Sequence, residues 1–446
     1  LEKRAALWWN GRITGSQKRR CPQMASMVNR VTMANWAKRL PAAERARGEA
    51  AQAPGGARAL RGLLAGLLGL GVALAPGVLR AELAAEPVPK VEKLPKRYGD
   101  SWLYVLDVNF PALLDAKGVL LDLAAKNRNY KANFGASQFA SLAESRTRSE
   151  FYVAETFYSR GVRGERSDFI TIYDKASAAP VAEIELPKAK RGLVVTQKGS
   201  FRLTGDDKLG LIFNFTPAAS VTVVDMVKRE VLGEVPIPGC SLVYPTGRRG
   251  FSTLCGNGTL ASFVLDAKGA VQRREVSEAF NDIDGDALFM KTGQAAGLTH
   301  FPTFTGNVRP VNLRGEVAQV GEAWSLVSAE ERAAGWRPGG WQVISGDARA
   351  RIYVLMHEGG KEGSHKSGGS EVWVFDARKQ SRVRRIVLDS WGISVEATRG
   401  RRPYLAVTNA DLAIDVYDAR SGAHLRTIGG GLAGTPLTLY ATRGRN

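Results

Sequence analysis

Short segments of alternating apolar and polar residues recur along the chain from residue 101 onward. In the clearest copies, one such segment ends at Asp, a short polar turn follows, and a second alternating segment completes the unit. These copies occupy residues 169–186, 221–235, 371–388 and 414–428. Alternation with a period of two is typical of β-strands that bury one face, and Asp favours the turn that joins them. Each copy therefore predicts a β-hairpin.

Weaker copies of the same pattern bring the number of repeats to seven. They centre on Asp122, Asp266 and Asn312, and the anchor residues of successive repeats lie between 41 and 64 positions apart. This interval leaves room for two more strands in each repeat, and four strands in roughly 40 to 50 residues is the spacing of a propeller blade. Sheets that are arranged radially cover one another's faces, which a single four-stranded sheet cannot do alone.

The repeats therefore predict an all-β fold, a seven-bladed β-propeller with four-stranded antiparallel blades. We expect the ring to be closed by the C-terminal strand, at residues 436–440, which would complete the first blade. A pair of β-sandwiches is the alternative fold. It explains the short strands but not the seven similar units.

A basic and then apolar segment precedes the predicted propeller. Arg58 and Arg61 are followed by an uncharged, Gly-rich run that contains an A-x-A sequence at residues 73–75. This order is typical of a secretory signal, and the run is short for a transmembrane helix, although a retained anchor is an alternative. The chain is thus predicted to comprise an upstream extension outside the mature protein, a signal peptide, an extended N-terminal arm and the propeller, at residues 1–57, 58–81, 82–100 and 101–446.

The formal net charge of +19 is concentrated before the predicted propeller. Residues 1–80 hold 14 Lys and Arg against 3 Glu, a net charge of +11, which leaves +8 for the other 366 residues. Because the excess lies in the leader, we predict no nucleic-acid-binding groove. The mildly basic remainder favours an acidic protein partner, although charge that serves solubility alone also explains it. Once the signal is removed, we expect no membrane association.

Two of the three cysteines, Cys240 and Cys255, flank a turn-rich stretch at residues 245–250. Cysteines that face each other across two strands of an exported protein are expected to be oxidised, so the sequence predicts a disulfide bond. A pair of free thiols is the alternative. A zinc site is not favoured, because no His lies nearby and two thiols do not complete such a site.

Residues that could carry catalysis are sparse. The chain has no nucleophile elbow, P-loop or dinucleotide fingerprint. The acidic stretch at residues 281–286 lacks the Glu that ends a calcium loop, so it is interpreted as a polar turn. The four histidines do not form a ligand pattern and lie apart, at His300, His357, His365 and His424. We therefore predict neither catalytic residues nor a metal in this chain.

Several motifs resemble one known family. Residues 158–168, with the sequence YSRGVRGERSD, resemble the F-S-R-x-x-R-G-E-R-T-D segment of the large subunits of methylamine and aromatic amine dehydrogenases. The longest and most specific match is at residues 331–342, with the sequence ERAAGWRPGGWQ, and residues 213–218 and 238–240 are also similar. The resemblance extends from about residue 87 to the C-terminus. It is closer to the aromatic (aralkylamine) branch.

The resemblance implies a specific biological role. Members of this family are periplasmic heterotetramers of two large and two small subunits, in which primary amines are oxidised to aldehyde and ammonia. The small subunit carries tryptophan tryptophylquinone and the catalytic base, and a blue copper protein, amicyanin- or azurin-like, accepts the electrons. With only three cysteines, this chain would be the large subunit, which holds no cofactor, walls the substrate channel and binds the small subunit.

The same resemblance implies roles for individual residues. In the family an early loop of the large subunit lines the substrate channel, and the corresponding loop here places Gln138 at the channel position with Phe139 beside it. Phe139 could instead belong to the core of a blade. Trp336, Arg337 and Trp341 either contact the small subunit or form a structural stack with Arg337 between the indoles.

Two other functions are consistent with an exported propeller. The first is a non-catalytic scaffold that only binds other proteins. The second is a propeller hydrolase of the lactonase type, which needs axial acids that bind calcium and a nearby His. The scattered histidines and the lack of clear axial acids make the hydrolase the weaker alternative.

Overall fold

The computed structural model describes residues 92–193, 196–429 and 431–444. The chain divides into two compact units, residues 1–90 and 91–446. The predicted upstream extension, the predicted signal peptide and the first ten residues of the predicted arm lie outside the described residues. In the described part of the chain, no helix is both long and apolar enough to cross a bilayer.

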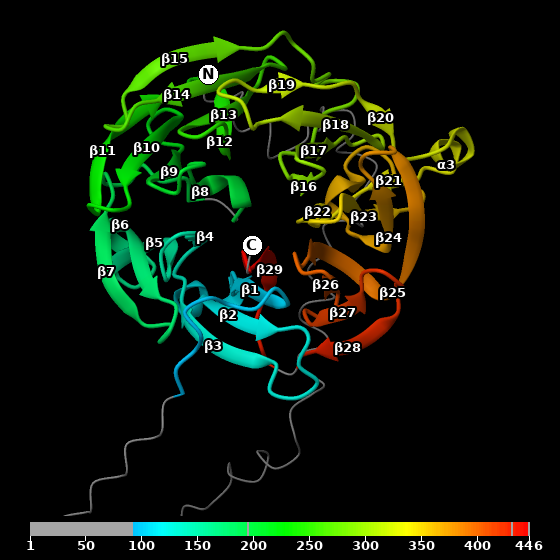
Figure 1. Cartoon of the computed structure of the whole chain (residues 1–446), viewed down its shortest axis with the longest axis horizontal. Coiled ribbons are helices and arrows are strands. Elements are labelled where there is room, and N and C mark those ends of the chain that lie inside the picture. The colour runs from blue at the N-terminus through cyan, green and yellow to red at the C-terminus, as the bar shows by residue number, and fades with distance from the viewer. Residues whose placement is uncertain (1–91, 194–195, 430, 445–446) are drawn as a thin grey trace, which may run out of the picture. The chain divides into compact units, whose positions relative to one another are not determined.

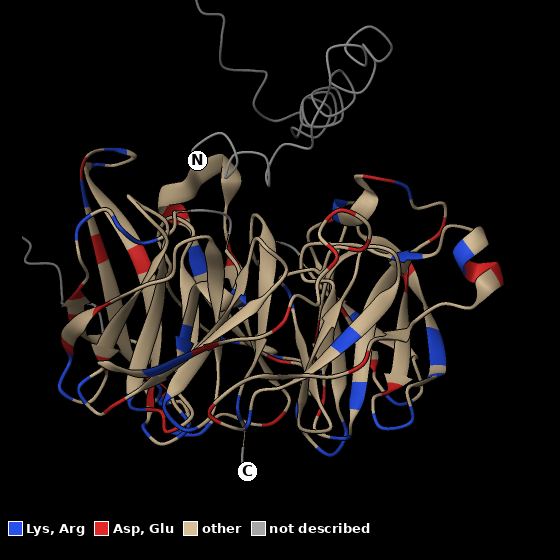
Figure 2. Ribbon diagram, turned by 90° about the horizontal axis from the view of Figure 1, so that it is seen from above, with Lys and Arg blue, Asp and Glu red and all other residues tan. Residues whose placement is uncertain are grey.

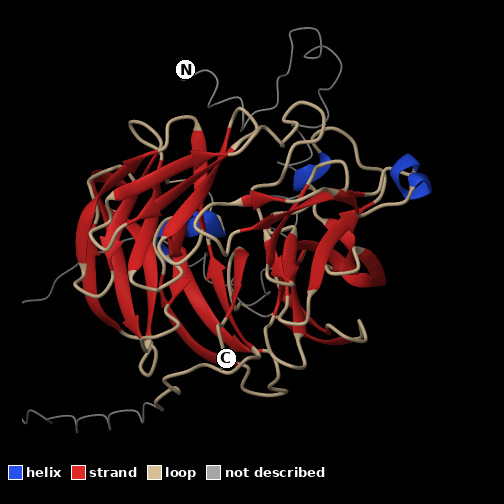
Figure 3. Cartoon of the chain, turned by 45° about the horizontal axis from the view of Figure 1, so that its top comes forward, coloured by secondary structure: helices blue, strands red, loops and turns tan. Residues whose placement is uncertain are grey.

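Antiparallel strands form almost all of the regular secondary structure of the second unit, and the few short helices lie in its loops (Figure 3). The strands form sheets that are arranged radially around a central axis (Figure 1). The first sheet contains β29 (Pro436–Ala441), β1 (Trp102–Asp107), β2 (Lys117–Asp122) and β3 (Tyr130–Gly135), in that order from the axis outward. The second contains β4 (Ser141–Glu144), β5 (Glu150–Arg160), β6 (Arg163–Asp174) and β7 (Pro180–Glu185).

The next three sheets repeat this plan. The third contains β8 (Phe201–Leu203), β9 (Leu209–Asn214), β10 (Ser220–Asp225) and β11 (Glu230–Pro236). The fourth contains β12 (Cys240–Pro245), β13 (Gly250–Cys255), β14 (Leu260–Leu265) and β15 (Val271–Val276). The fifth contains β16 (Gly293–Ala295), β17 (Leu298–Pro302), β18 (Asn307–Asn312), β19 (Gln319–Val320) and β20 (Trp324–Ser325).

The last sheet is larger. It contains β21 (Arg337–Pro338), β22 (Ile344–Gly346), β23 (Arg351–His357), β24 (Gly369–Asp376), β25 (Ser381–Ala397), β26 (Tyr404–Asn409), β27 (Ile414–Asp418) and β28 (His424–Ile428). One α-helix and three 3-10 helices are described in the loops: α3 (Ala329–Ala333), η4 (Phe110–Asp115), η5 (Lys198–Ser200) and η6 (Ser364–Lys366).

The prediction of seven separate four-stranded blades is wrong. The described strands form six sheets, of which five have four or five strands and one has eight. The difference arises at β25, whose 17 residues pair with β24 at one end and with β26 at the other. This segment contains no Pro, and its only glycine, Gly392, pairs with residues of both neighbouring strands. The pairing shifts register near Gly392, between Val387 and Gly392 on the β24 side and between Gly392 and Ser394 on the β26 side, but the strand continues through the shift, so the last two predicted repeats share one sheet.

Both ends of the ring meet as the sequence predicts. β29 pairs antiparallel with β1, from Leu103 opposite Ala441 to Asp107 opposite Pro436, so the C-terminal strand completes the first sheet. The four clear hairpin repeats are also confirmed, because β6 pairs with β7, β10 with β11, β24 with β25 and β27 with β28.

Buried side chains fill the spaces between neighbouring sheets. One core cluster joins Tyr152 and Ile170 of the second sheet to Phe201 and Ile212 of the third. Another joins the first sheet to the last and so closes the ring, through Leu103, Val119, Ala406 and Val416. Apolar faces that a single sheet could not cover are thus buried by the adjacent sheet, which is the main source of stability for such an arrangement.

One end of the sheets carries the longer loops. Neighbouring strands of a sheet are antiparallel. The chain therefore leaves the outer strand of one sheet and enters the inner strand of the next sheet at the same end of the molecule's second unit. We call this end the upper face, after its position in Figure 2. It includes the loops at residues 108–116, 136–140, 196–200, 277–292, 326–336 and 358–368.

Candidate functional site

The turn that joins β3 to β4 carries Gln138 and Phe139. Both residues adopt left-handed backbone conformations, with φ angles of 44° and 56°. The Gln138 side chain is buried, and its amide donates a hydrogen bond to the Gly161 carbonyl oxygen at 3.4 Å. Phe139 is half-buried, with its ring 6.2 Å from that of the exposed Phe110. Of the two predicted channel residues, Phe139 is therefore the one that presents an apolar surface.

Arg191 holds this turn from beneath. It is only 3% exposed, and its guanidinium donates hydrogen bonds to the carbonyl oxygens of Gln138 at 3.0 Å and Phe139 at 3.1 Å. A third hydrogen bond reaches the Thr156 hydroxyl at 2.6 Å. Burial lowers the pKa of Arg191 to about 10, and the nearby negative charge of Asp168 opposes that shift. Arg191 therefore holds two consecutive residues in the left-handed conformation. Residues other than glycine adopt this conformation only where their surroundings stabilise it.

The charge of Arg191 is balanced within the motif at residues 158–168. Its Nε lies 3.7 Å from Oδ1 of the fully buried Asp168, which also accepts two hydrogen bonds from Arg166, at 3.0 and 2.9 Å. Hydrogen bonds between ionised groups are stronger than those between neutral groups. The family-like motif thus contributes to a buried ion-pair network that underlies the turn.

A second carboxylate fixes the start of the turn. Oε2 of Glu155 accepts a hydrogen bond from the Ser137 backbone N–H at 2.8 Å, and Oε1 accepts one from the Thr171 hydroxyl at 2.5 Å. Burial raises the pKa of the Glu155 carboxyl, and these two hydrogen bonds partly oppose the shift. Together with Arg191, Glu155 anchors three consecutive residues of the turn to the second sheet.

The alternative that Phe139 belongs to the core of a blade is not what the structure describes. Within the described residues, Phe139 is absent from all six clusters of buried apolar side chains, whereas Phe134, five positions earlier, packs in one of them. Phe139 instead lies on the upper face. Its assignment to a substrate channel stays a prediction.

The structure does not bring Trp336, Arg337 and Trp341 into a single cluster. Trp336 is buried, with its ring 5.0 Å from that of Trp373. The guanidinium that lies over these two indoles belongs to Arg385, at 4.6 and 4.9 Å from the ring centroids, and Arg337 instead pairs with His357 across β21 and β23. The expected stack of Arg337 between Trp336 and Trp341 is therefore not formed, and Arg385 with Trp373 packs on Trp336 instead.

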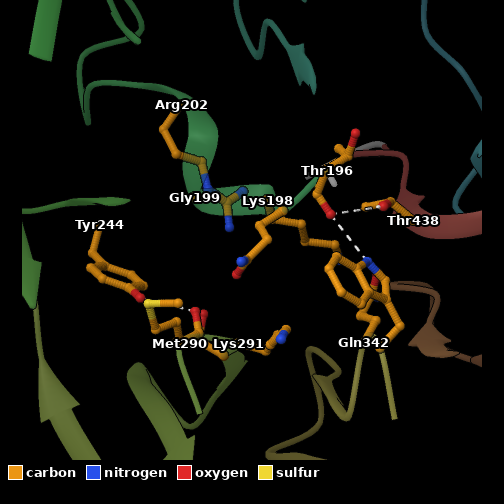
Figure 4. A pocket seen from close by; sticks show the side chains of 12 residues that line it. Thr196, Lys198, Gly199, Arg202, Tyr244, Met290, Lys291, Gln342 and Thr438 are labelled. Carbon is orange, nitrogen blue, oxygen red and sulfur yellow. Dashed lines mark hydrogen bonds between the residues drawn. The ribbon is translucent and has the colours of Figure 1, made fainter. Parts of the chain in front are cut away.

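Trp341 lies elsewhere, at a small cavity near the axis. Its indole N–H donates to the Thr196 carbonyl oxygen at 3.1 Å, and the ammonium of Lys291 lies 4.7 Å from the centre of its ring. The cavity has a volume of about 20 Å³ and is shown in Figure 4. It is lined by residues of five sheets or of the loops next to them, including Thr196, Lys198, Arg202, Tyr244, Lys291, Trp341, Gln342 and Thr438.

Exposed aromatic side chains gather on the upper face. Four of them are between 40% and 50% exposed and lie in the loops or strand ends of that face: Phe110, Phe157, Phe215 and Trp391. Phe157 also borders an open hollow of about 420 Å³ on the projecting β5–β6 hairpin, together with Tyr158 and Phe169. Aromatic residues are enriched in the contact surfaces of proteins. In the described part of the chain, most of the strongly exposed aromatic side chains thus lie on the upper face.

Two further predictions concern cysteine and metal chemistry. Cys240 and Cys255 face each other across β12 and β13 and are joined by a disulfide bond, which confirms that prediction. In the acidic turn, a carboxylate oxygen of Asp282 accepts a hydrogen bond from the Gly285 N–H at 2.9 Å. Across the described parts of the chain, no three His, Cys, Asp or Glu side chains are placed to hold a metal ion.

Comparison with known proteins identifies related sequences. The family model for the methylamine dehydrogenase heavy chain matches residues 119–439. The methylamine dehydrogenase heavy chain of Paracoccus versutus is 31% identical over 285 residues, which are 63% of this chain and 66% of that protein. That of Methylobacillus flagellatus is 28% identical over 312 residues, which are 69% and 76% of the two chains. The present chain therefore matches just under two thirds of the length of the first relative.

A solved structure supports the fold alone. A protein of Bacteroides fragilis that is described as a 6-phosphogluconolactonase superposes with a TM-score of 0.50. The two sequences are 12% identical, and the match covers 76% of this chain and 98% of the other. At this level of identity only the arrangement of the strands is shared, and no activity follows from it.

Proposed function

Because the chain belongs to the methylamine dehydrogenase heavy chain family, we propose that it is the large, non-quinone subunit of a periplasmic amine dehydrogenase. The complete enzyme would oxidise primary amines to aldehyde and ammonia and pass the electrons to a blue copper protein, amicyanin- or azurin-like. The family match, which spans residues 119–439, carries this proposal. The disulfide between Cys240 and Cys255 supports an oxidising compartment such as the periplasm.

The chemistry is assigned to a small partner subunit. There, tryptophan tryptophylquinone would supply the group that takes up electrons from the amine. The role of the present chain is to bind that subunit, to wall the path of the substrate and to exclude water. This division agrees with the geometry of the large chain, whose buried charged groups hold a turn in place.

The turn at Gln138 and Phe139 is the proposed wall of the substrate path. The Phe139 and Phe110 rings provide an apolar surface on the upper face, and Arg191 and Glu155 fix the backbone beneath it. An apolar wall of this kind would pack against the hydrocarbon part of an amine and would favour an aromatic over a methyl substituent. The proposal therefore places the enzyme with the aromatic (aralkylamine) branch.

The small subunit is proposed to dock on the upper face, in an assembly of two large and two small subunits. Support comes from the four exposed aromatic side chains and from the hollow on the β5–β6 hairpin. Aromatic side chains are enriched in the contact surfaces of proteins. The substrate wall lies on the same face, so a docked subunit would enclose it.

Co-purification of the two subunits tests this arrangement. Phe157→Glu places a charge in the proposed interface and should reduce capture of a tagged small subunit at least tenfold. Tyr130→Glu is the matched control, because Tyr130 is 47% exposed but begins β3 at the opposite end of its sheet. Equal capture by both variants would exclude the upper face. Capture of other periplasmic proteins, without any amine oxidation, would instead favour the scaffold alternative.

A further inference from the structure

The cavity near the axis collects more positive charge than its surroundings neutralise. In Figure 4, Lys198 and Arg202 approach this space from one segment of the chain and Lys291 from another. Lys198 forms an ion pair with Glu396 at 2.8 Å. Among the described residues, neither Arg202 nor Lys291 has a carboxylate within 4.0 Å, and the buried Nε of Arg202 donates no hydrogen bond. Within the described part of the chain, two of the three cations thus have no carboxylate partner.

Glu396 cannot neutralise all three cations. Its Oε2 already accepts hydrogen bonds from Lys198 at 2.8 Å, Gln342 at 2.9 Å and Ser345 at 2.8 Å. Its Oε1 accepts another from the Ala441 N–H at 3.0 Å. This carboxylate therefore has little remaining capacity and is directed toward the inner strands.

The remaining contacts of Lys291 offset only part of the free energy that is lost when its charged ammonium group is buried. The Trp341 ring attracts the ammonium, but a cation–π contact is weaker than the ion pair that Lys291 lacks among the described residues. Burial lowers the pKa of Lys291 to about 8, and the charge of Lys366 adds to that shift. Burial also lowers the pKa of Lys198 to about 8, against the opposing effect of Glu396. Both ammonium groups are still largely protonated at neutral pH, so the cavity is cationic.

We propose that this cavity binds one small inorganic anion, such as chloride, between Lys198, Arg202 and Lys291. Buried polar groups without a partner in the protein are usually satisfied by an ordered water or an ion. A water molecule would complete the hydrogen bonds but would leave the positive charge in place. The volume of about 20 Å³ is enough for roughly one water-sized particle, which favours a monatomic anion over sulfate or phosphate.

The anion would connect elements that are far apart in the sequence. Lys198 and Arg202 belong to η5 and β8, whereas Lys291 lies in the loop that leads to β16. A bound anion would therefore act as a non-covalent link between sheets at the centre of the ring. This inference does not rest on the proposed enzymatic function, because it concerns only charges within the chain.

Bromide provides a direct probe. Crystals of the purified full chain, soaked in sodium bromide, should show an anomalous peak between the three cations. Thermal unfolding should occur at a higher temperature in sodium chloride than in sodium gluconate of equal ionic strength, because gluconate is too large for the cavity. The absence of bromide density in the cavity would overturn the proposal.

Matched variants show whether the effect of chloride on thermal stability arises at this cavity. Lys291→Met keeps an apolar contact with Trp341 and should weaken chloride binding at least tenfold, as should Arg202→Met, which serves if the first variant does not fold. Lys268→Met removes an exposed lysine of the β14–β15 turn and should respond to chloride like the wild type. An undiminished chloride response in both cavity variants would overturn the proposal, since screening of surface charge would then explain it.

Discussion

Replacing Arg191 with Met should destabilise the protein and alter the turn that it supports. The substitution removes a buried cation beside Asp168, and removing one partner of a buried pair costs about 3–5 kcal/mol in general. Asp168 keeps two hydrogen bonds from Arg166, at 3.0 and 2.9 Å, so the loss belongs at the lower end of that range. The lost hydrogen bonds to the Gln138 and Phe139 carbonyls contribute about 1 kcal/mol each. We therefore expect a loss of about 3 to 5 kcal/mol.

Denaturant unfolding of the wild type and the variants measures this loss. Arg191→Lys should fall between them, because Lys keeps a charge near Asp168 but lacks the planar fork that reaches both carbonyls. Arg160→Met, at an exposed position of the same hairpin, should change stability by no more than about 0.5 kcal/mol. A loss below about 1 kcal/mol for Arg191→Met would refute the claim that this ion-pair network holds the turn.

Further predictions concern the turn at Gln138 and Phe139, the disulfide bond and the cavity near the axis. Phe139→Ala and Gln138→Phe, assembled with the small subunit, should change the ratio of kcat/KM for phenylethylamine over methylamine by roughly tenfold or more, and an unchanged ratio in both would remove the turn from the substrate path. Intact mass after reduction and alkylation should reveal two thiols from Cys240 and Cys255, whose labelling without reductant would contradict the disulfide. Chloride affinity should fall as the pH rises through about 8, where Lys291 loses the proton that an anion requires, and constant affinity between pH 7 and 10 would argue against this.

The strand pattern was predictable because it depends on local alternation. The hairpins at residues 221–235 and 414–428 form as expected, since each alternates in polarity and has a polar turn between its strands. The separation of the last two repeats was not predictable in this way. Residues 389–393 could form a loop between two sheets or continue as strand, and the outcome depends on pairing with both β24 and β26. Neither Pro nor a Gly-rich turn in the sequence indicates which of the two occurs.

The site was only partly predictable for a similar reason. The motif at residues 158–168 indicated the resemblance to the family, but no local pattern indicated that Arg191 would pair with Asp168 or support Gln138. Likewise, the sequence predicted a stack of Arg337 between Trp336 and Trp341, whereas Trp336 packs against Trp373 with Arg385 over both rings. Contacts between segments that are distant in sequence depend on the packing of sheets, which a local pattern does not encode.

The most direct test of the proposed function is amine oxidation by the purified chain, alone and after co-expression with a small subunit from a related enzyme or the same genome. The account predicts that the chain alone neither absorbs visible light nor reduces a dye when phenylethylamine is added, and that the complex does both. Amine oxidation by the isolated chain would contradict the assignment of the chemistry to a partner. A stable complex that contains the quinone but oxidises no primary amine would contradict the proposed activity.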